Sequence, residues 1–147
     1  MKKENKGQTE VMEVLNKFSD AYSRQDIDDI MELFAHDPKT VFIGTGIDEE
    51  CIGIDHVKKQ LQRDFDQAQK LSMDLKCRHI SVSEPMAWAI SELNVHTKIG
   101  LKKMDIFCRL SAVLEKQKEE WRFVNMHIST PTSGQKKGES YPTCDLY

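Results

Sequence analysis

The spacing of apolar residues changes once in this chain, near Leu71, and this change constrains the fold more than any other feature. Before that residue, apolar side chains recur every three or four positions, as on one face of an α-helix. After it, apolar and polar residues alternate, as in strands with one buried face. The sequence therefore predicts helices first and consecutive strands afterwards, which is the order of an α+β domain.

Three helices are predicted in the N-terminal half. The first covers residues 8–24 and carries an apolar stripe that ends at Tyr22. The second starts at an N-cap, Asp26, and stops before Pro38, because the residue before a proline avoids helical geometry. The third is predicted to begin at a cap, Asp55. Its buried positions are Val57, Leu61, Phe65 and Ala68.

A short strand is expected near residues 40–43, and longer ones dominate the second half. The predicted long strands cover residues 71–83, 86–98, 102–116 and 121–129. Most strands have only about five or six residues, and longer ones must twist and bend. We expect a cone-shaped, curved antiparallel sheet wrapped on three N-terminal helices. The mouth of such a cone is a natural ligand site.

Composition excludes several classes of function. The 147 residues include 21 basic and 24 acidic side chains, for a net charge of -3, so nucleic acid and anionic membrane partners are not expected. No stretch approaches the roughly 20 apolar residues of a membrane span, and the polar N-terminus does not resemble a secretory signal. We expect a cytoplasmic protein with one domain over residues 8–131 and a polar tail over residues 132–147.

Cysteine and histidine spacing does not indicate a metal site. The four cysteines lie far apart, without a Cys-x-x-Cys pair or a histidine in zinc-finger spacing, and they are Cys51, Cys77, Cys108 and Cys144. They are interpreted as buried apolar side chains or surface thiols. An open alternative is that a metal is bound jointly by His79, His96 and His127. The alternation of side chains along separate strands does not show whether these histidines meet. No metal and no cofactor are predicted.

Three parts of the sequence resemble a known family. One is Ala87-Trp88 after a turn, and another is the run from Ile43 to Glu50. The most specific is the last predicted hairpin, in which Arg109 precedes Trp121 by twelve residues and His127 follows. Over about residues 8–131 the chain resembles the SnoaL-like branch of the nuclear-transport-factor-2-like superfamily. That superfamily also contains ketosteroid isomerase and the association domain of calcium/calmodulin-dependent kinase.

The resemblance implies a cystatin-like cone, a pocket between the sheet and the helices, and a homodimer formed through the outer face of the sheet. It does not imply one reaction, because this fold hosts isomerases, cyclases, hydrolases, oligomerisation hubs and binding proteins. Function therefore has to be argued from the residues of the site.

Arg109 is the most informative polar residue for a site. It alternates with apolar neighbours and lies on a mixed face with Phe107 and Val113, where an arginine can bind a carboxylate through two hydrogen bonds. The alternative is a structural ion pair with Asp105 or with a glutamate on a neighbouring strand. The family resemblance favours the ligand-binding role.

Four further residues complete the predicted site. His127 is expected to hydrogen-bond a ligand, and Tyr22, Phe34 and Trp88 to pack on it; the alternative is a structural or core role for each. No catalytic residue is predicted. The candidate carboxylates facing the cavity are Glu50, Glu92 and Asp105.

These observations predict a domain that binds an unknown small molecule in an apolar pocket anchored by Arg109. Two alternatives remain open. One is an oligomerisation module resembling the kinase association domain. The other is an isomerase- or hydrolase-type enzyme that acts on a small carbonyl compound.

Overall fold

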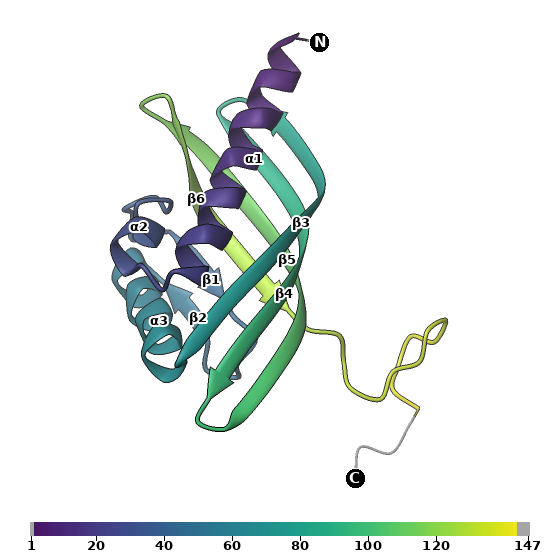
Figure 1. Cartoon of the computed structure of the whole chain (residues 1–147). Helices are drawn as coiled ribbons and strands as arrows, with labels where there is room; N and C mark the ends of the chain where they lie inside the picture. Colours follow the sequence, from purple (N-terminus) through teal and green to yellow (C-terminus); the bar gives the residue numbers. More distant parts are fainter. Residues whose placement is uncertain (1, 144–147) are drawn as a thin grey trace.

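The computed structural model describes residues 2–143 of the chain, and the side chains of residues 6–143 (Figure 1). The predictions for Cys144 and for the last residues of the tail lie outside this range. The helices are α1 (Lys2–Ser23), α2 (Ile27–Met31) and α3 (Ile54–Gln67). The strands are β1 (Val41–Ile43), β2 (Glu50–Ile52), β3 (Lys70–Ser83), β4 (Met86–Ile99), β5 (Lys102–Gln117) and β6 (Glu120–Ser129). The predicted α+β class and the change of period near Leu71 are confirmed.

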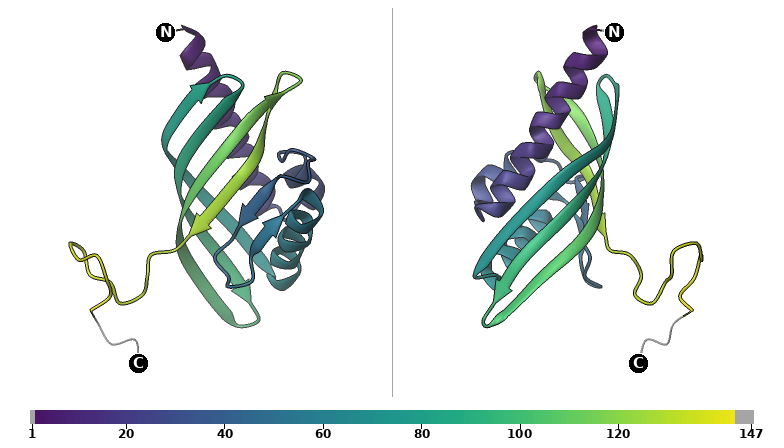
Figure 2. Two further views of the ribbon diagram at one scale, coloured as in Figure 1. Left: turned by 180° about the vertical axis from the view of Figure 1, so that it is seen from behind. Right: turned by 45° about the vertical axis from the view of Figure 1, so that its right-hand side comes forward.

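The strands form one open, curved sheet in the order β2-β1-β6-β5-β4-β3. Neighbouring strands are antiparallel except for β1 and β6, which are parallel. The edge strands β2 and β3 do not pair with each other, so the cone is open and does not close into a barrel. Helix α1 crosses the inner face of the sheet, and α2 and α3 lie beside β1 and β2 (Figures 1 and 2). Seen from behind, the outer face of β3–β6 carries no described helix (Figure 2).

The helices differ from the predictions at their ends. Helix α1 begins at Lys2, before the predicted start, and α2 has only five residues. The N-cap of α3 is Gly53, whereas Asp55 lies within the first helical turn. Gly53 has a φ of 94°, and a side chain is strained in that conformation. The chain therefore needs a glycine where it turns from β2 into α3.

A β-bulge in β6 reverses which residues face inward. Phe123 and Asn125 pair with consecutive residues of β5, so Val124 between them has no partner. Phe123 is buried, whereas Asn125 and His127 are exposed. Simple alternation along the strand would place His127 on the same face as Trp121, but the extra residue places the two side chains on opposite faces.

An aromatic cluster forms the centre of the core between α1, α2 and the sheet. Phe18, Phe34 and Phe123 are completely buried, and the ring of Phe123 lies 5.7 Å from that of Phe18 and 5.4 Å from that of Phe34. Ala87 and Ala89 on β4 are also completely buried.

The cap of α2 can be tested separately from its charge. The side chain of Asp26 accepts a hydrogen bond from the backbone N–H of Asp29 at 3.0 Å, as predicted for an N-cap. Asp26→Ala is expected to lower the free energy of unfolding by about 1 kcal/mol. Asp26→Asn removes the same charge but keeps the capping oxygen, so it should retain most of that stability. Equal losses in urea denaturation would attribute the effect to the exposed ion pair with Arg24.

The described part of the tail contains turns but no helix or strand. Residues 130–143 lead away from the end of β6 in all views (Figures 1 and 2). Among the described residues, the helices are too short or too polar to cross a membrane.

Candidate functional site

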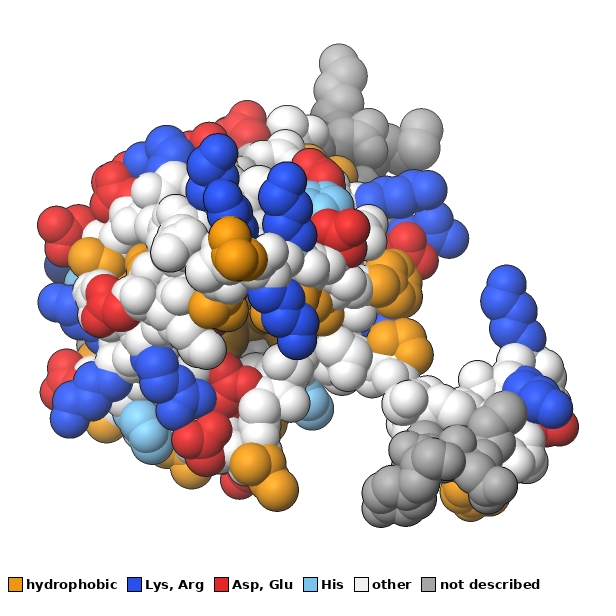
Figure 3. Space-filling model, turned by 60° about the horizontal axis from the view of Figure 1, so that its bottom comes forward, with side chains coloured by type: hydrophobic (Ala, Val, Ile, Leu, Met, Phe, Trp, Pro, Cys, Tyr) orange, Lys and Arg blue, Asp and Glu red, His pale blue; other side chains and the backbone are white. Residues whose placement is uncertain are grey.

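A small cavity lies between the inner face of the sheet, the β1–β2 hairpin and α3. Its volume is about 90 Å³. The apolar part of the wall comes from Phe42, Met73, Leu93, Val95, Ile106 and Ile128. The other lining residues are Tyr22, Gly44, Thr45, Glu49, Asp64 and Cys108. Figure 3 views the molecule from the lower end of Figure 1, where apolar side chains surround a hollow.

Four polar side chains form a connected network at this cavity. The Tyr22 hydroxyl donates a hydrogen bond to Asp64 Oδ2 at 2.9 Å. Gln60 Nε2 donates to the other carboxylate oxygen of Asp64 at 2.9 Å and to Glu49 Oε1 at 2.5 Å. The network thus joins α1, α3 and the β1–β2 hairpin around two carboxylates.

Neighbouring contacts hold this network in place. Gln25, just after α1, donates hydrogen bonds to the backbone carbonyls of Phe65 and Ala68 at 2.8 and 3.0 Å, and so ties the end of α1 to the end of α3. The rings of Tyr22 and Phe65 also meet edge to face at 5.3 Å. In the hairpin, the carboxylate of Glu49 accepts a hydrogen bond from the backbone N–H of Gly46. These contacts support the positions of both carboxylates.

The environment of Asp64 makes its carboxyl group a weaker acid than an exposed aspartate. Burial raises the pKa of Asp64 above its usual value, although the hydrogen bonds from Tyr22 and Gln60 act in the opposite direction. The nearest arginine on α3, Arg63, instead binds Asp48 at 2.8 Å. Within residues 6–143, no Lys, Arg or His nitrogen lies within 4.0 Å of the Asp64 carboxylate. A carboxyl group of this kind can exchange protons nearer to neutral pH than an exposed aspartate.

Tyr22 complements this carboxyl group. Burial and the adjacent carboxylate of Asp64 raise its pKa well above the usual value, so the phenol stays protonated and acts as a hydrogen-bond donor. The site therefore combines an acid–base group with a neutral donor beside an apolar cavity.

Sequence reasoning located only one of these four residues, Tyr22. Gln60 and Asp64 lie three and seven positions after Val57, which places them on the buried stripe of α3. A glutamine and an aspartate on an otherwise apolar stripe were the available signal. The prediction named Glu50 in the acidic turn, but its side chain is exposed on β2, and the preceding Glu49 contacts the network.

The structure does not bring the five predicted ligand-binding residues together. Tyr22 lines the cavity as predicted. Phe34 is completely buried in the core and does not reach it. Trp88, Arg109 and His127 lie on the outer face of the sheet, with Trp88 46% exposed. Placing these three in the cone was wrong, because alternation groups the residues of a strand by face but does not say which face is concave.

Arg109 has neutral partners on that outer face. Its guanidinium group donates to Ser129 Oγ at 3.3 Å and to the carbonyl of Thr130 at 3.4 Å. It lies opposite Glu92 in the sheet, but no carboxylate oxygen of the described residues is within 4.0 Å. The alternative role of Arg109 in a structural ion pair with Asp105 or a neighbouring glutamate is therefore not found among the described residues, and a ligand contact by Arg109 stays a prediction.

The other two candidate carboxylates also lie outside the cavity. Glu92 is 3.9 Å from Arg78, and Asp105 binds His96 at 2.6 Å. In the described part of the chain, no group of three or more His, Cys, Asp or Glu side chains has a geometry suited to a metal ion.

Comparisons with known proteins agree with this architecture. The model of the SnoaL-like domain family matches residues 11–133. No curated protein matches the sequence. Among solved structures, a candidate dehydratase of the nuclear-transport-factor-2-like family from Streptomyces avermitilis is similar with a TM-score of 0.80 and 15% identity, over 88% of this chain and 99% of that one.

Two further solved structures show the same fold. One is a nuclear-transport-factor-2-like superfamily protein from Salmonella enterica serovar Typhimurium, with a TM-score of 0.79 and 22% identity over 90% of this chain and 96% of that one. The other is a candidate scytalone dehydratase from Novosphingobium aromaticivorans. Its TM-score is 0.78 and its identity 16%, over 90% of this chain and 89% of that one. The match to the family model covers most of the sequence, and the chain therefore belongs to the SnoaL-like domain family.

Proposed function

We propose that this protein binds a small carbonyl compound in the cavity and isomerises it by proton transfer, with Asp64 as the acid–base group. The observation that carries the proposal is a partly buried Asp64 that lacks a cationic partner, accepts a hydrogen bond from Tyr22 and borders an apolar cavity. The SnoaL-like fold supports a small-molecule-binding or isomerase-like domain.

The proposed reaction needs only the residues described. The ionised Asp64 removes a proton from the carbon beside the carbonyl group, and Tyr22 turns its hydroxyl toward the developing enolate oxygen. Asp64 then returns the proton to another carbon of the same molecule. The double bond moves, no net proton is gained or lost, and no cofactor is required.

The size of the cavity limits the substrate. A volume of about 90 Å³ corresponds to roughly three water molecules at about 30 Å³ each. Pockets for drug-sized ligands are several times larger, at about 300–1,000 Å³. The substrate is therefore small, and its carbonyl end enters the cavity beside Tyr22 and Asp64.

Isomerisation of cyclohex-3-enone to cyclohex-2-enone, followed by NMR in buffered D₂O, tests this proposal. The protein is expected to accelerate the reaction above the buffer rate. Because Asp64 returns the proton that it removed, the carbon that receives it should gain less deuterium than in the buffer-catalysed reaction. Cyclopent-3-enone and an open-chain β,γ-unsaturated ketone extend the test to other shapes. If none of the three reacts faster than in buffer alone, proton-transfer catalysis by this site is wrong.

A second copy of the chain is proposed as the partner of the outer face. Trp88, Ile90 and Phe107 are 46%, 47% and 42% exposed there. Glu92 and Arg109 place both charges on the same face, which suits a symmetric contact in which each copy supplies both. We therefore propose a homodimer through the sheet.

Trp88→Asp is expected to convert this dimer to monomer in sedimentation velocity, because burying a carboxylate in an apolar contact is unfavourable. Ile52→Asp is the matched control, since Ile52 is 69% exposed on the edge strand β2, away from the proposed contact. A parent protein that sediments as a monomer would contradict the dimer. Rings of many subunits would instead favour the alternative function of an association module.

A further inference from the structure

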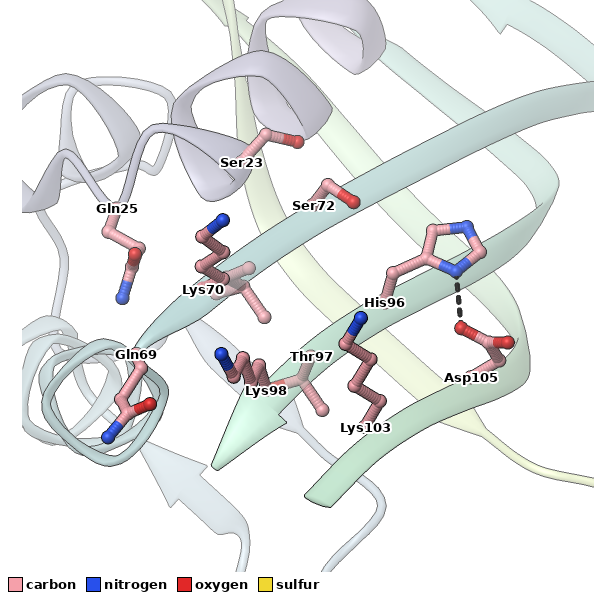
Figure 4. Close-up of a pocket in the computed structure, with 11 residues that line it drawn as sticks. Ser23, Gln25, Gln69, Lys70, Ser72, His96, Thr97, Lys98, Lys103 and Asp105 are labelled. Carbon is pink, nitrogen blue, oxygen red and sulfur yellow. Dashed lines mark hydrogen bonds and ion pairs between the residues drawn. The ribbon is translucent and has the colours of Figure 1, made fainter. Parts of the chain in front are cut away.

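An open groove of about 510 Å³ lies outside the cone, along the lower ends of β3, β4 and β5 (Figure 4). It is separate from the cavity at Tyr22 and Asp64, because the two sets of lining residues do not overlap. Three lysines dominate it: Lys70 on β3, Lys98 on β4 and Lys103 on β5.

These three lysines form a row across the sheet. Lys70 is paired directly with Lys98, and Lys98 directly with Lys103. Residues that face each other in this way have Cβ atoms about 4.5–5.5 Å apart, and like charges in such pairs destabilise a sheet. The row is therefore unfavourable in the free protein, and a bound anion would relieve the repulsion.

No described carboxylate forms an ion pair with the row, although Asp105 lines the same groove. No carboxylate oxygen of residues 6–143 lies within 4.0 Å of the ammonium groups of Lys70, Lys98 or Lys103. Both nearby aspartates contact the ring of His96 instead. Its Nδ1 lies 2.6 Å from Asp105 Oδ1 (Figure 4), and its Nε2 lies 3.0 Å from Asp74 Oδ2. The three ammonium groups thus remain available to a ligand.

The donor set points to a particular kind of anion. The groove contains no arginine, which is the residue that matches the planar geometry of a carboxylate with two parallel hydrogen bonds. Lysines bind phosphate as point charges, and Ser72 and Gln69 add a hydroxyl and an amide at the same groove. The volume lies within the range of pockets for whole small molecules. We infer that the Lys70–Lys98–Lys103 row binds the phosphate group of a phosphorylated small molecule or lipid.

Binding can be measured with inorganic phosphate and phenyl phosphate at constant ionic strength, by ¹H–¹⁵N NMR and by thermal shift. Both anions are expected to move the amide signals at the lower ends of β3–β5 and to raise the melting temperature. Lys98→Ala should weaken binding by about 3-fold, as for an exposed ion pair, and Lys98→Ala with Lys103→Ala should remove measurable binding. Without phosphate, the single variant should be at least as stable as the parent, because the repulsion is smaller.

Lys76→Ala is the matched control, because Lys76 lies on the same strand and face as Lys70 but outside the groove. This variant should bind phosphate like the parent. Equal shifts for the parent, Lys76→Ala and the double variant, or equal shifts with chloride, would overturn the site.

A separate measurement distinguishes the source of the phosphate. Leu101, at the tip of the β4–β5 hairpin, is fully exposed beside the row. Co-sedimentation with phosphatidic acid vesicles that requires both Lys98 and Leu101 would assign the site to a lipid headgroup. Binding of phenyl phosphate without vesicle binding would assign it to a soluble phosphate ester. Failure of either ligand to bind leaves catalysis at Asp64 untouched, since the two sites share no residue.

Discussion

Replacing Asp64 by asparagine is expected to lower the rate of the proposed isomerisation by about 10²–10⁴-fold, the usual contribution of a positioned acid–base group. Asparagine has nearly the same shape and keeps an oxygen that can accept the hydrogen bond from Tyr22, but it cannot accept a proton from substrate. The measurement is the NMR rate of double-bond migration in cyclohex-3-enone. Asp66→Asn is the matched control on the same helix, because Asp66 is exposed and hydrogen-bonds only to Gln62 in the described structure.

The pH dependence of the same reaction is an independent indicator of Asp64. The base must be ionised, so the rate should rise as pH increases through the pKa of Asp64, which burial raises above the usual 3.8. The folded protein also holds this proton more tightly than the unfolded chain does. Stability is therefore expected to fall as pH rises from about 4 through the raised pKa, and Asp64→Asn should remove that fall.

These two readouts separate a catalytic role from a structural one. A catalytic Asp64 predicts a slow Asp64→Asn variant that is as stable as the parent at neutral pH, or more stable. A variant that unfolds more readily and retains activity in proportion to its folded fraction would assign Asp64 a structural role only. Tyr22→Phe should reduce the rate less, because it removes a hydrogen-bond donor and leaves the base.

Phe123→Ala is expected to lower the free energy of unfolding by about 3–5 kcal/mol, a large fraction of the 5–15 kcal/mol typical of a folded domain. The Phe123 ring is completely buried against Phe18 and Phe34, so its removal leaves a cavity between α1 and the sheet. The residue also joins β6 to the segment after α2, since its N–H donates to the Leu33 carbonyl at 2.8 Å and its carbonyl accepts from the Ala35 N–H at 2.9 Å.

Urea denaturation measures this loss, and two controls define it. Phe123→Leu keeps most of the volume and should cost clearly less than the alanine variant. Leu101→Ala removes a fully exposed side chain and should change stability by less than about 0.5 kcal/mol. A loss for Phe123→Ala as small as that of Leu101→Ala would contradict the packing of the aromatic cluster.

The sequence was a good guide to the elements and a poor guide to the site. The four long strands were predicted to within a residue or two at each end, because the alternation of buried and exposed residues in β3–β6 is a local property. The N-cap of α2 was also predicted correctly, because Asp26 comes directly before an apolar stripe. The cap of α3 was missed because the turn requires a backbone conformation, supplied by Gly53, rather than a side-chain oxygen.

The site depended on relations that no local pattern contains. Arg109, Trp88 and His127 stood out as chemically capable residues, but the direction in which the sheet curves places them outside the cone. Asp64 was not among the predicted site residues, although its spacing from Val57 already places it on the buried stripe of α3.

By itself, the sequence determined the order of helices and strands, the faces along each strand apart from the irregularities at Arg78 in β3 and Val124 in β6, and membership of the SnoaL-like family. Periodicity encodes these properties because burial repeats with the geometry of each element. Only the tertiary structure decided which face is concave, which carboxylates meet Tyr22, and that Lys70, Lys98 and Lys103 stand side by side. These depend on curvature and register, which bring together residues distant in the chain, and no single segment specifies them.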